Sequence, residues 1–143
     1  MLKGIDPAIG PDLLAILRGM GHGDEIVIAD ANFPSQTMGR RVARADGVDA
    51  VRMVRAIAAI MPLDDFVPAA AFRMAVVDEP DTVPPITAEF AAALAAGGYA
   101  GPIEPIERFA FYARAREAFA VVATGEARLY GNLILKKGVV RLG

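Results

Sequence analysis

The chain has no cysteine and only one histidine, and both scarcities restrict its chemistry. Without cysteine there can be no disulfide and no thiolate nucleophile, and zinc lacks its usual sulfur ligands. One imidazole cannot form a histidine-rich metal site within a single chain. Disulfide, thiol and histidine-rich metal chemistry are therefore excluded within one chain.

The chain has no excess of positive charge, and we expect neither a membrane segment nor a leader peptide. The formal net charge is −2, so no overall positive field attracts phosphate backbones, and we expect no nucleic-acid partner. No apolar stretch reaches the roughly 20 residues of a membrane span. The N-terminal MLKGIDPAIG has neither the apolar core nor the cleavage site of a signal peptide. We expect a soluble, cytoplasmic protein that makes no membrane contact.

What the sequence does contain is a high proportion of apolar residues. Hydrophobic residues make up 55% of the 143 residues and charged residues 22%, which is typical of a folded globular protein. The length fits one domain over residues 1–143. So much apolar surface on a small chain favours burial between subunits, and we therefore expect a homo-oligomer.

Predicted helices and strands alternate along the chain. Apolar residues at helical spacing predict helices over residues 11–21, 48–61, 86–101 and 108–119. Apolar runs predict strands over residues 25–30, 64–79, 118–125 and 132–140, whereas residues 35–48 fit either structure and 102–107 carry no prediction. Gly21 and Thr87 are predicted helix caps, and Gly97–Gly98 a helix stop. The alternation predicts a single layered α/β domain with a mostly parallel central sheet flanked by helices.

His22 stands in the glycine-rich segment GMGHG, directly before the apolar run EIVIA. Its unperturbed pKa of roughly 6.5 suits proton transfer near neutral pH, and the flanking glycines leave the imidazole uncovered. A structural role is the alternative, because a protonated histidine is also favoured at a helix C-terminus. The residues alone leave both interpretations open. A dinucleotide-binding fingerprint does not fit, because its glycines follow a strand and open a helix, whereas these follow a helix.

Asp30 ends the same apolar run. The carboxyl ends of parallel strands are where α/β folds place their ligands. Asp30 could also cap the next segment, but Asn32 and Pro34 indicate a loop, which favours ligand contact. The adjacent Asp64 and Asp65 do not suggest a carboxylate pair, because neighbouring side chains point apart. We predict that they are turn or capping residues.

A further polar group precedes the last predicted strand, in YGNLILKKG. Tyr130 and Asn132 would share one face if this segment is extended, and a phenol and an amide can each donate and accept hydrogen bonds. A neutral, hydroxyl-rich ligand such as a sugar needs these groups. Arg108 is another candidate, because the start of a helix disfavours a cation and its presence there requires a different explanation.

Three segments in this order, GHGDEIVIADANFP, RFAFYARAREAFAVVATGE and YGNLILKKGV, closely resemble the ribose pyranase/L-fucose mutarotase family, and specifically its L-fucose mutarotase branch. The resemblance covers nearly the whole chain. It implies an isomerase that interconverts the α and β anomers of a monosaccharide, such as L-fucose, without a cofactor or metal. It also implies a ring-based homo-oligomer, often a decamer, with sites at subunit boundaries.

The resemblance assigns roles to particular residues. His22 corresponds to the family's acid and Asp30 to a sugar contact, while the last sugar-binding group falls on Tyr130, Gly131 and Asn132. Arg108 matches a contact that is histidine in the ribose branch, which favours the fucose branch. Tyr130 is our candidate for the proton transfer opposite His22. Two alternatives stay open: a pyranase acting on ribose-like sugars, and a non-catalytic sugar-binding or transport-accessory protein.

The spacing of His22 and Asp30 bears on how a site could be built. They are eight positions apart, with a predicted strand between them. An extended segment rises about 3.3 Å per residue, which would separate the two residues by about 20–26 Å. One monosaccharide cannot reach both. We therefore expect each site to combine His22 of one subunit with the remaining residues of its neighbour.

Overall fold

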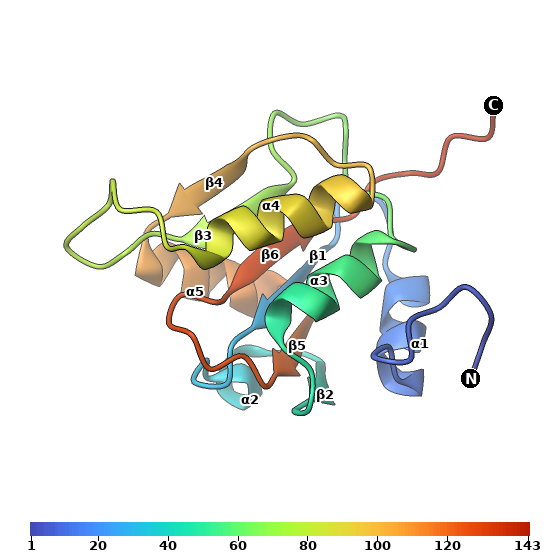
Figure 1. Ribbon diagram of the computed structural model, residues 1–143, viewed down its shortest axis with the longest axis horizontal. Helices are drawn as coiled ribbons and strands as arrows, with labels where there is room; N and C mark the ends of the chain where they lie inside the picture. The colour runs from blue at the N-terminus through green and yellow to red at the C-terminus, as the bar shows by residue number, and fades with distance from the viewer.

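A six-stranded sheet forms the centre of the computed structural model, which describes residues 1–143 (Figure 1). Its strands are β1 (Glu25–Ala29), β2 (Val42–Ala45), β3 (Ala71–Met74), β4 (Ile103–Ile106), β5 (Ala120–Thr124) and β6 (Leu133–Lys136). They are arranged in the order β2-β5-β1-β6-β3-β4. β5 is parallel to β1 and β2, and β3 is parallel to β4, whereas β6 is antiparallel to β1 and β3. The predicted mostly parallel sheet is confirmed.

Helices cover both faces of the sheet. They are α1 (Pro11–Gly19), α2 (Ser35–Met38), α3 (Ala50–Ala58), α4 (Ile86–Ala96) and α5 (Arg108–Glu117). Figure 1 shows α3 and α4 side by side across the near face, with α5 behind the sheet. One apolar cluster contains residues of α1, α3 and α4, and a second contains residues of α5. The predicted α/β layering is therefore confirmed. None of these helices has the length and apolar character that a membrane crossing requires.

The central strand β1 is buried on both faces, as its continuous apolar run predicts. Ile26 and Ile28 belong to the cluster that includes α3 and α4, and Val27 and Ala29 belong to the cluster on the α5 side. All four residues are fully buried. Because burying a valine- or isoleucine-sized side chain contributes about 1.5–3 kcal/mol, β1 is held firmly and fixes the position of the residues at its two ends.

Two predicted helix caps are wrong. α1 ends before Gly21, with Met20 already extended, and the left-handed glycine of the following turn is Gly23, at φ 86°. α4 begins at Ile86 directly after a proline, which is pre-organised for a helix start, so Thr87 lies inside the first turn instead of before it. The predicted stop is confirmed, because Gly97 follows α4 and Gly98 is left-handed, at φ 95°.

Two segments acquire their structure from the sheet. Residues 35–48, which fit either structure, contain α2 followed by β2. Residues 102–107 form β4 in spite of Pro105, because this strand pairs only with β3 and lies at the sheet edge, where a missing backbone N–H is tolerated.

Strand direction determines where the candidate polar residues lie. The carboxyl ends of the five parallel strands and the amino end of β6 meet at one edge of the sheet, called the carboxyl edge below. Asp30 follows β1 at this edge, and Asn132 precedes β6 there. His22 precedes β1 and therefore lies at the opposite, amino edge.

Candidate active site

Asp30 and Asn132 form a reciprocal pair at the carboxyl edge. The side-chain oxygen of Asn132 accepts the backbone N–H of Asp30 at 2.8 Å, and the Asn132 amide donates to Asp30 Oδ2 at 3.0 Å. Asp30 Oδ1 accepts the backbone N–H of Asn32 at 2.9 Å. Both side chains are buried. The pairing holds both side chains in one fixed geometry, with few hydrogen-bonding positions left for a ligand.

Two opposing effects act on the pKa of the Asp30 carboxyl group. Burial raises its pKa above the ordinary value, because the charged form loses its water. Hydrogen bonds from the backbone of Asn32 and Phe33, from the Asn132 amide and from the backbone of Gly131 act in the opposite direction. Asp30 is therefore a carboxylate whose hydrogen-bonding environment is organised by its own loop and by β6.

Tyr130 is placed by an unusual backbone conformation. Its φ of 59° lies in the left-handed region, so the segment is not extended there, and the expectation that Tyr130 and Asn132 share one strand face is wrong. Because β6 begins only at Leu133, the turn directs Asn132 back onto Asp30. The Tyr130 ring packs against the cluster on the α5 side, and its hydroxyl oxygen accepts the backbone N–H of Val77 at 3.1 Å.

Arg108 is the first residue of α5, and its position there has a local explanation. The carboxylate of the preceding Glu107 caps the helix by accepting the backbone N–H groups of Phe109, at 2.8 Å, and Ala110, at 3.1 Å. These bonds hold the pKa of Glu107 below its ordinary value, and the charge of Arg108 acts in the same direction. The Arg108 guanidinium lies over the Phe109 ring, 4.6 Å from its centre, while its Nε is buried without a hydrogen-bond partner.

Arg108 and Tyr130 are connected through the segment that follows β3. A cavity of about 550 Å³ opens beside Arg108. Val77, whose N–H bonds the Tyr130 hydroxyl, lines this cavity together with Arg108. The ring of Phe33, three residues after Asp30, lies 5.7 Å from the ring of Tyr112, which in turn lies 6.4 Å from the ring of Phe109. Because Phe109 lines the cavity, these rings connect the cavity wall to the segment that follows Asp30. Four of the sequence-predicted residues therefore gather at the carboxyl edge, namely Asp30, Arg108, Tyr130 and Asn132.

His22 lies at the amino edge with a partner that sequence reasoning missed. Its Nε2 is 3.0 Å from Oδ1 of Asp64, and the exposed fractions of the two side chains are 44% and 4%. Asp64 also accepts the backbone N–H of Phe66 at 3.0 Å, which is the turn role predicted for it. This bond is the main reason that the pKa of Asp64 lies below its ordinary value, and the bond to His22 adds to the effect. The neighbouring Asp65 points elsewhere and pairs with Arg141, as expected for adjacent residues.

The alternative role of His22 as the cap of α1 is filled by another residue. Lys137 Nζ donates to the carbonyl oxygens of Leu17, at 2.8 Å, and Met20, at 2.6 Å, at the end of that helix. The Lys137 carbonyl also accepts the backbone N–H of Gly23 at 2.9 Å. The helix end and the histidine loop are thus held without the imidazole, whose ring carries out no capping and stays half exposed.

The two groups of candidate residues do not converge within one chain. His22 adjoins the amino end of β1, where Gly23 bonds Lys137, and Asp30 adjoins its carboxyl end, where it bonds Asn132. The five fully extended residues of β1 lie between them. Nowhere in residues 1–143 do three or more histidine, cysteine, aspartate or glutamate side chains gather in a way that could hold a metal ion.

Comparison with known proteins identifies close relatives along the whole chain. The model of the RbsD / FucU transport protein family matches residues 3–140. The L-fucose mutarotase of Actinobacillus pleuropneumoniae serotype 5b (strain L20) is 45% identical over 140 residues, covering 97% of each chain. The fucose mutarotase of Danio rerio is 47% identical over 152 aligned positions, covering 98% of this chain and 95% of its own.

Solved structures give the same result. The fucose mutarotase from Streptococcus pneumoniae in complex with L-fucose superposes with a TM-score of 0.90 and 43% identity, covering 98% of this chain and 100% of its own. Bacillus subtilis RbsD complexed with D-ribose has a TM-score of 0.74 at 24% identity, covering 99% of this chain and 100% of its own, which shows a shared fold. The resemblance seen in the sequence is confirmed. The chain belongs to the RbsD / FucU transport protein family.

Proposed function

We propose that this protein is an L-fucose mutarotase, an isomerase that interconverts the α and β anomers of L-fucose by acid–base opening and closing of the sugar ring. The observation that carries the proposal is the identity of 43–47%, over nearly the full length, to fucose mutarotases, one of them in complex with L-fucose. The geometry adds a half-exposed imidazole on a buried carboxylate and a separate cluster of sugar-compatible polar groups. The expected absence of a cofactor and the cytoplasmic location stay predictions.

In this proposal His22 is the acid, and Asp64 determines which of its nitrogens reacts. Because the carboxylate of Asp64 accepts from Nε2–H, the other nitrogen, Nδ1, faces the sugar. The protonated ring donates from Nδ1 to the sugar ring oxygen, and the bond between C1 and that oxygen breaks. On reclosure, the neutral ring takes the proton back. Asp64 stabilises the imidazolium that exists before each opening step.

Tyr130 carries the complementary proton transfer at the anomeric hydroxyl, directly or through a water. Its oxygen already accepts the N–H of Val77, so one lone pair is left to take the proton of the anomeric hydroxyl while the phenolic proton passes to a water. At ring closure both transfers run in reverse. Loss of the proton from the anomeric hydroxyl, together with ring opening, produces the open-chain aldehyde. Rotation about the C1–C2 bond followed by closure gives the other anomer. Acid–base assistance of this kind contributes roughly 10²–10⁴-fold, which is sufficient for a reaction already feasible in water.

The remaining groups at the carboxyl edge bind the sugar. Asp30 and Asn132 orient each other, so that the free hydrogen-bonding positions of the pair point in fixed directions toward sugar hydroxyls. The backbone at Gly131 lies against Asp30 and completes this side of the site. Arg108 supplies a charged donor, because its Nε is buried without a protein partner.

We further propose that each site is completed by two subunits of a ring-based homo-oligomer, such as a decamer. His22 and the sugar-binding group lie at opposite edges of the sheet within one chain. Each half is bordered by an exposed aromatic side chain. The Phe66 ring, 63% exposed, lies 5.3 Å from that of His22 in a tilted arrangement, and the Phe109 ring, 64% exposed, lies under Arg108. Covering each exposed ring removes apolar surface from water, which favours contact with a partner surface. Bringing the two edges together would bury both and place His22 beside Tyr130.

Anomer exchange measured by NMR magnetisation transfer tests the function. L-fucose, D-ribose and several other monosaccharides are compared with wild type, with His22→Ala, and with Asp65→Asn as a nearby control. We expect wild type and the control to accelerate exchange of L-fucose, and His22→Ala to lose the acceleration. Preferential acceleration of D-ribose would instead favour a ribose-type pyranase, and binding without acceleration would favour a sugar-binding or transport-accessory protein.

A further inference from the structure

We infer that Glu126 and Arg128 form a positioning unit that sets the geometry of Tyr130, Gly131 and Asn132 from the opposite side of their loop. The inference rests on the proposed function, since it concerns how the sugar-binding group is held. The loop runs from residue 125, after β5, to residue 132, before β6, and it carries the left-handed Tyr130. A loop with such a strained residue needs support from outside its own backbone.

Glu126 fastens the beginning of this loop to the strand that bears Asp30. Its backbone carbonyl accepts the N–H of Ala31, directly after Asp30, at 2.8 Å. Its backbone N–H is 3.2 Å from the hydroxyl oxygen of Thr124, and that hydroxyl donates to the carbonyl of Ala29 at 2.7 Å. These contacts fix the backbone of residue 126 to both ends of the Asp30 turn.

The side chain of Glu126 is a buried carboxylate, 4% exposed, that forms an ion pair with Arg128. Its Oε1 accepts the backbone N–H of Arg128 at 3.0 Å and Arg128 Nε at 2.9 Å, and its Oε2 accepts Arg128 Nη2 at 3.1 Å. The pairing with Arg128 is the main reason that the pKa of Glu126 lies below its ordinary value. A two-pronged pair of this kind fixes direction as well as distance.

The loop returns across this unit, and only a glycine can follow that path. A Cβ atom on Gly131 would lie 2.7 Å from Cγ of Glu126 and 3.1 Å from the carbonyl oxygen of Arg128. On its other side it would meet Cβ of Asp30 at 3.4 Å. Gly131 is therefore packed between the Glu126–Arg128 unit and the sugar-binding carboxylate, so a shift of the unit moves the backbone that joins Tyr130 to Asn132.

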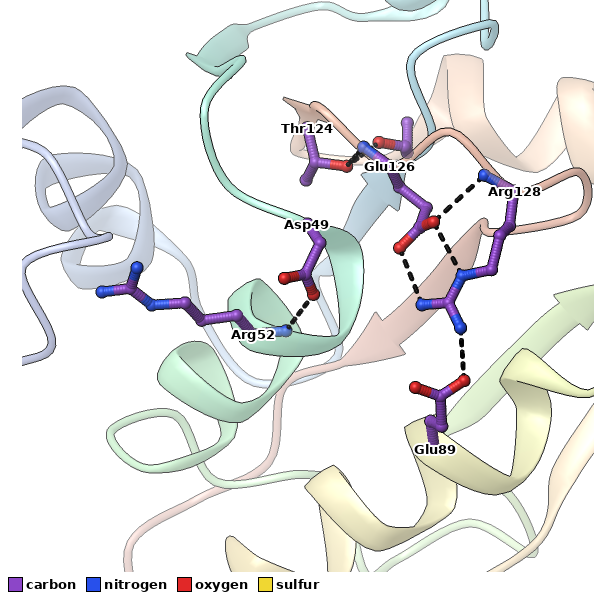
Figure 2. Close-up of polar contacts among 7 residues, drawn as sticks. Asp49, Arg52, Glu89, Thr124, Glu126 and Arg128 are labelled. Carbon is purple, nitrogen blue, oxygen red and sulfur yellow. Dashed lines mark hydrogen bonds and ion pairs between the residues drawn. The ribbon is translucent and has the colours of Figure 1, made fainter.

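The unit is anchored on the face of the sheet opposite to the Tyr130 ring. Arg128 also pairs with Glu89 in the first turn of α4, and Glu126 receives a hydrogen bond from the backbone of Ala50 at the start of α3. Figure 2 shows Arg128 between Glu126 and Glu89. The Tyr130 ring instead packs with the cluster on the α5 side. Glu126 and Arg128 therefore act through the loop backbone, as positioning residues, and not by touching the sugar.

Arg128 forms an inner pair with Glu126 and an outer pair with Glu89, and the two pairs differ in how much they stabilise the loop. Arg128 and Glu89 are both about half exposed, and an exposed ion pair contributes little. Glu126 is buried, so removal of its partner leaves an uncompensated carboxylate directly under Gly131. We therefore expect the inner pair to control the site, with the outer pair as a minor support.

Steady-state anomer exchange of L-fucose separates positioning from general destabilisation. We compare wild type with Arg128→Ala, with Arg128→Lys, and with Arg40→Ala, which removes an exposed ion pair to Glu117 far from this loop. Arg128→Ala should lower kcat/KM by roughly 10–100-fold, mostly through KM, because misplaced sugar contacts weaken binding in ground state and transition state alike. Arg128→Lys should lie between, since lysine retains the charge and loses the fork geometry. Arg40→Ala should match wild type.

Two further readouts keep the inference falsifiable. The side-chain amide resonance of Asn132 should shift in Arg128→Ala and stay unchanged in Arg40→Ala, with thermal unfolding confirming that each variant is folded. Unchanged KM and an unchanged Asn132 resonance in folded Arg128→Ala and Arg128→Lys would overturn the inference. If wild type binds L-fucose without accelerating exchange, the proposed function fails, and the affinity for L-fucose and the Asn132 resonance still decide the positioning role.

Discussion

The imidazole of His22 and the carboxylate of Asp64, 42 residues apart in the chain, lie 3.0 Å from each other through Nε2 and Oδ1. The carboxylate is buried and the imidazole half exposed, so the pair has one fixed side and one side that faces outward. A histidine held in this way has one nitrogen bound to the carboxylate and the other left free. This relationship leads to the first of four predictions.

Asp64→Asn should lower kcat for anomer exchange by about 10–100-fold with a smaller change in KM. The amide oxygen can take the place of Oδ1, which contacts both Nε2 of His22 and the backbone N–H of Phe66, but the negative charge opposite the protonated ring is lost. The side-chain oxygen can still accept the N–H of Phe66, so the turn is retained. Asp65→Asn is the matched control, because Asp65 is exposed and pairs with Arg141. Equal loss of activity in both variants would contradict the assignment.

Mixing two inactive variants should restore activity if sites are shared between subunits. His22→Ala and Tyr130→Phe are unfolded together and refolded at equal concentration, and exchange of L-fucose is compared with that of each variant refolded alone. Random assembly leaves about one site in four with His22 from one chain and Tyr130 from its neighbour, so about a quarter of wild-type activity should return. Mixtures that stay as inactive as their components, although native mass spectrometry shows mixed oligomers, would place each site within one chain.

Arg108→His should change the preference between sugars. The buried Nε of Arg108 has no protein partner and is available to a sugar hydroxyl, whereas a histidine is shorter and lacks the second donor edge. Loss of one charge-assisted hydrogen bond costs about 1.5–3 kcal/mol, so kcat/KM for L-fucose should fall by roughly 10–100-fold. The decrease for D-ribose should be smaller. Arg116→His, in the last turn of the same helix, is the control; a parallel decrease for both sugars would argue against a role in specificity.

The stability contributed by Glu126 should disappear in acid. Its folded-state pKa lies below the ordinary value of 4.5, so between those two values the unfolded chain binds more protons than the folded one. The contribution is therefore fully present above the ordinary pKa and is lost as pH falls through the lowered one. Urea unfolding of wild type and Glu126→Gln from pH 7 to pH 3 measures it: the difference in unfolding free energy should be constant down to about pH 5 and then shrink. A difference that grows in acid would reverse the assigned direction of the shift.

The fold could be predicted from the sequence where a single local pattern decides the structure. The run EIVIA is apolar at every position after Glu25, which is the pattern expected of a strand buried on both faces. The edge strand β4 could not be predicted, because Pro105 argues against a strand and only its position at the sheet edge makes it acceptable. Caps failed for a related reason: α1 is closed by Lys137, which is 117 residues from Met20.

In the candidate site, too, local sequence patterns could be interpreted, whereas contacts between distant residues could not. Asp30 could be proposed because the end of a buried strand is a local feature, and the resemblance to the family made His22, Arg108 and Tyr130–Asn132 candidates. Asp64 could not be found, because its signal is a contact with a loop 42 residues away and its own neighbourhood looks like an ordinary turn. Glu126 and Arg128 likewise look like unremarkable charges until the loop closes over them.

The length of β1 matters for assembly as well as for packing. In an assembly whose sites use His22 of one chain and Asp30 of the next, this strand sets the distance between successive sites around the ring. A one-residue insertion would lengthen that distance by about 3.3 Å and would turn every later side chain to the other face of the sheet. Because all subunits carry the same insertion, the error would recur at every interface and prevent the ring from closing. Substitutions in β1 that keep its length should be tolerated far better than any change in residue number.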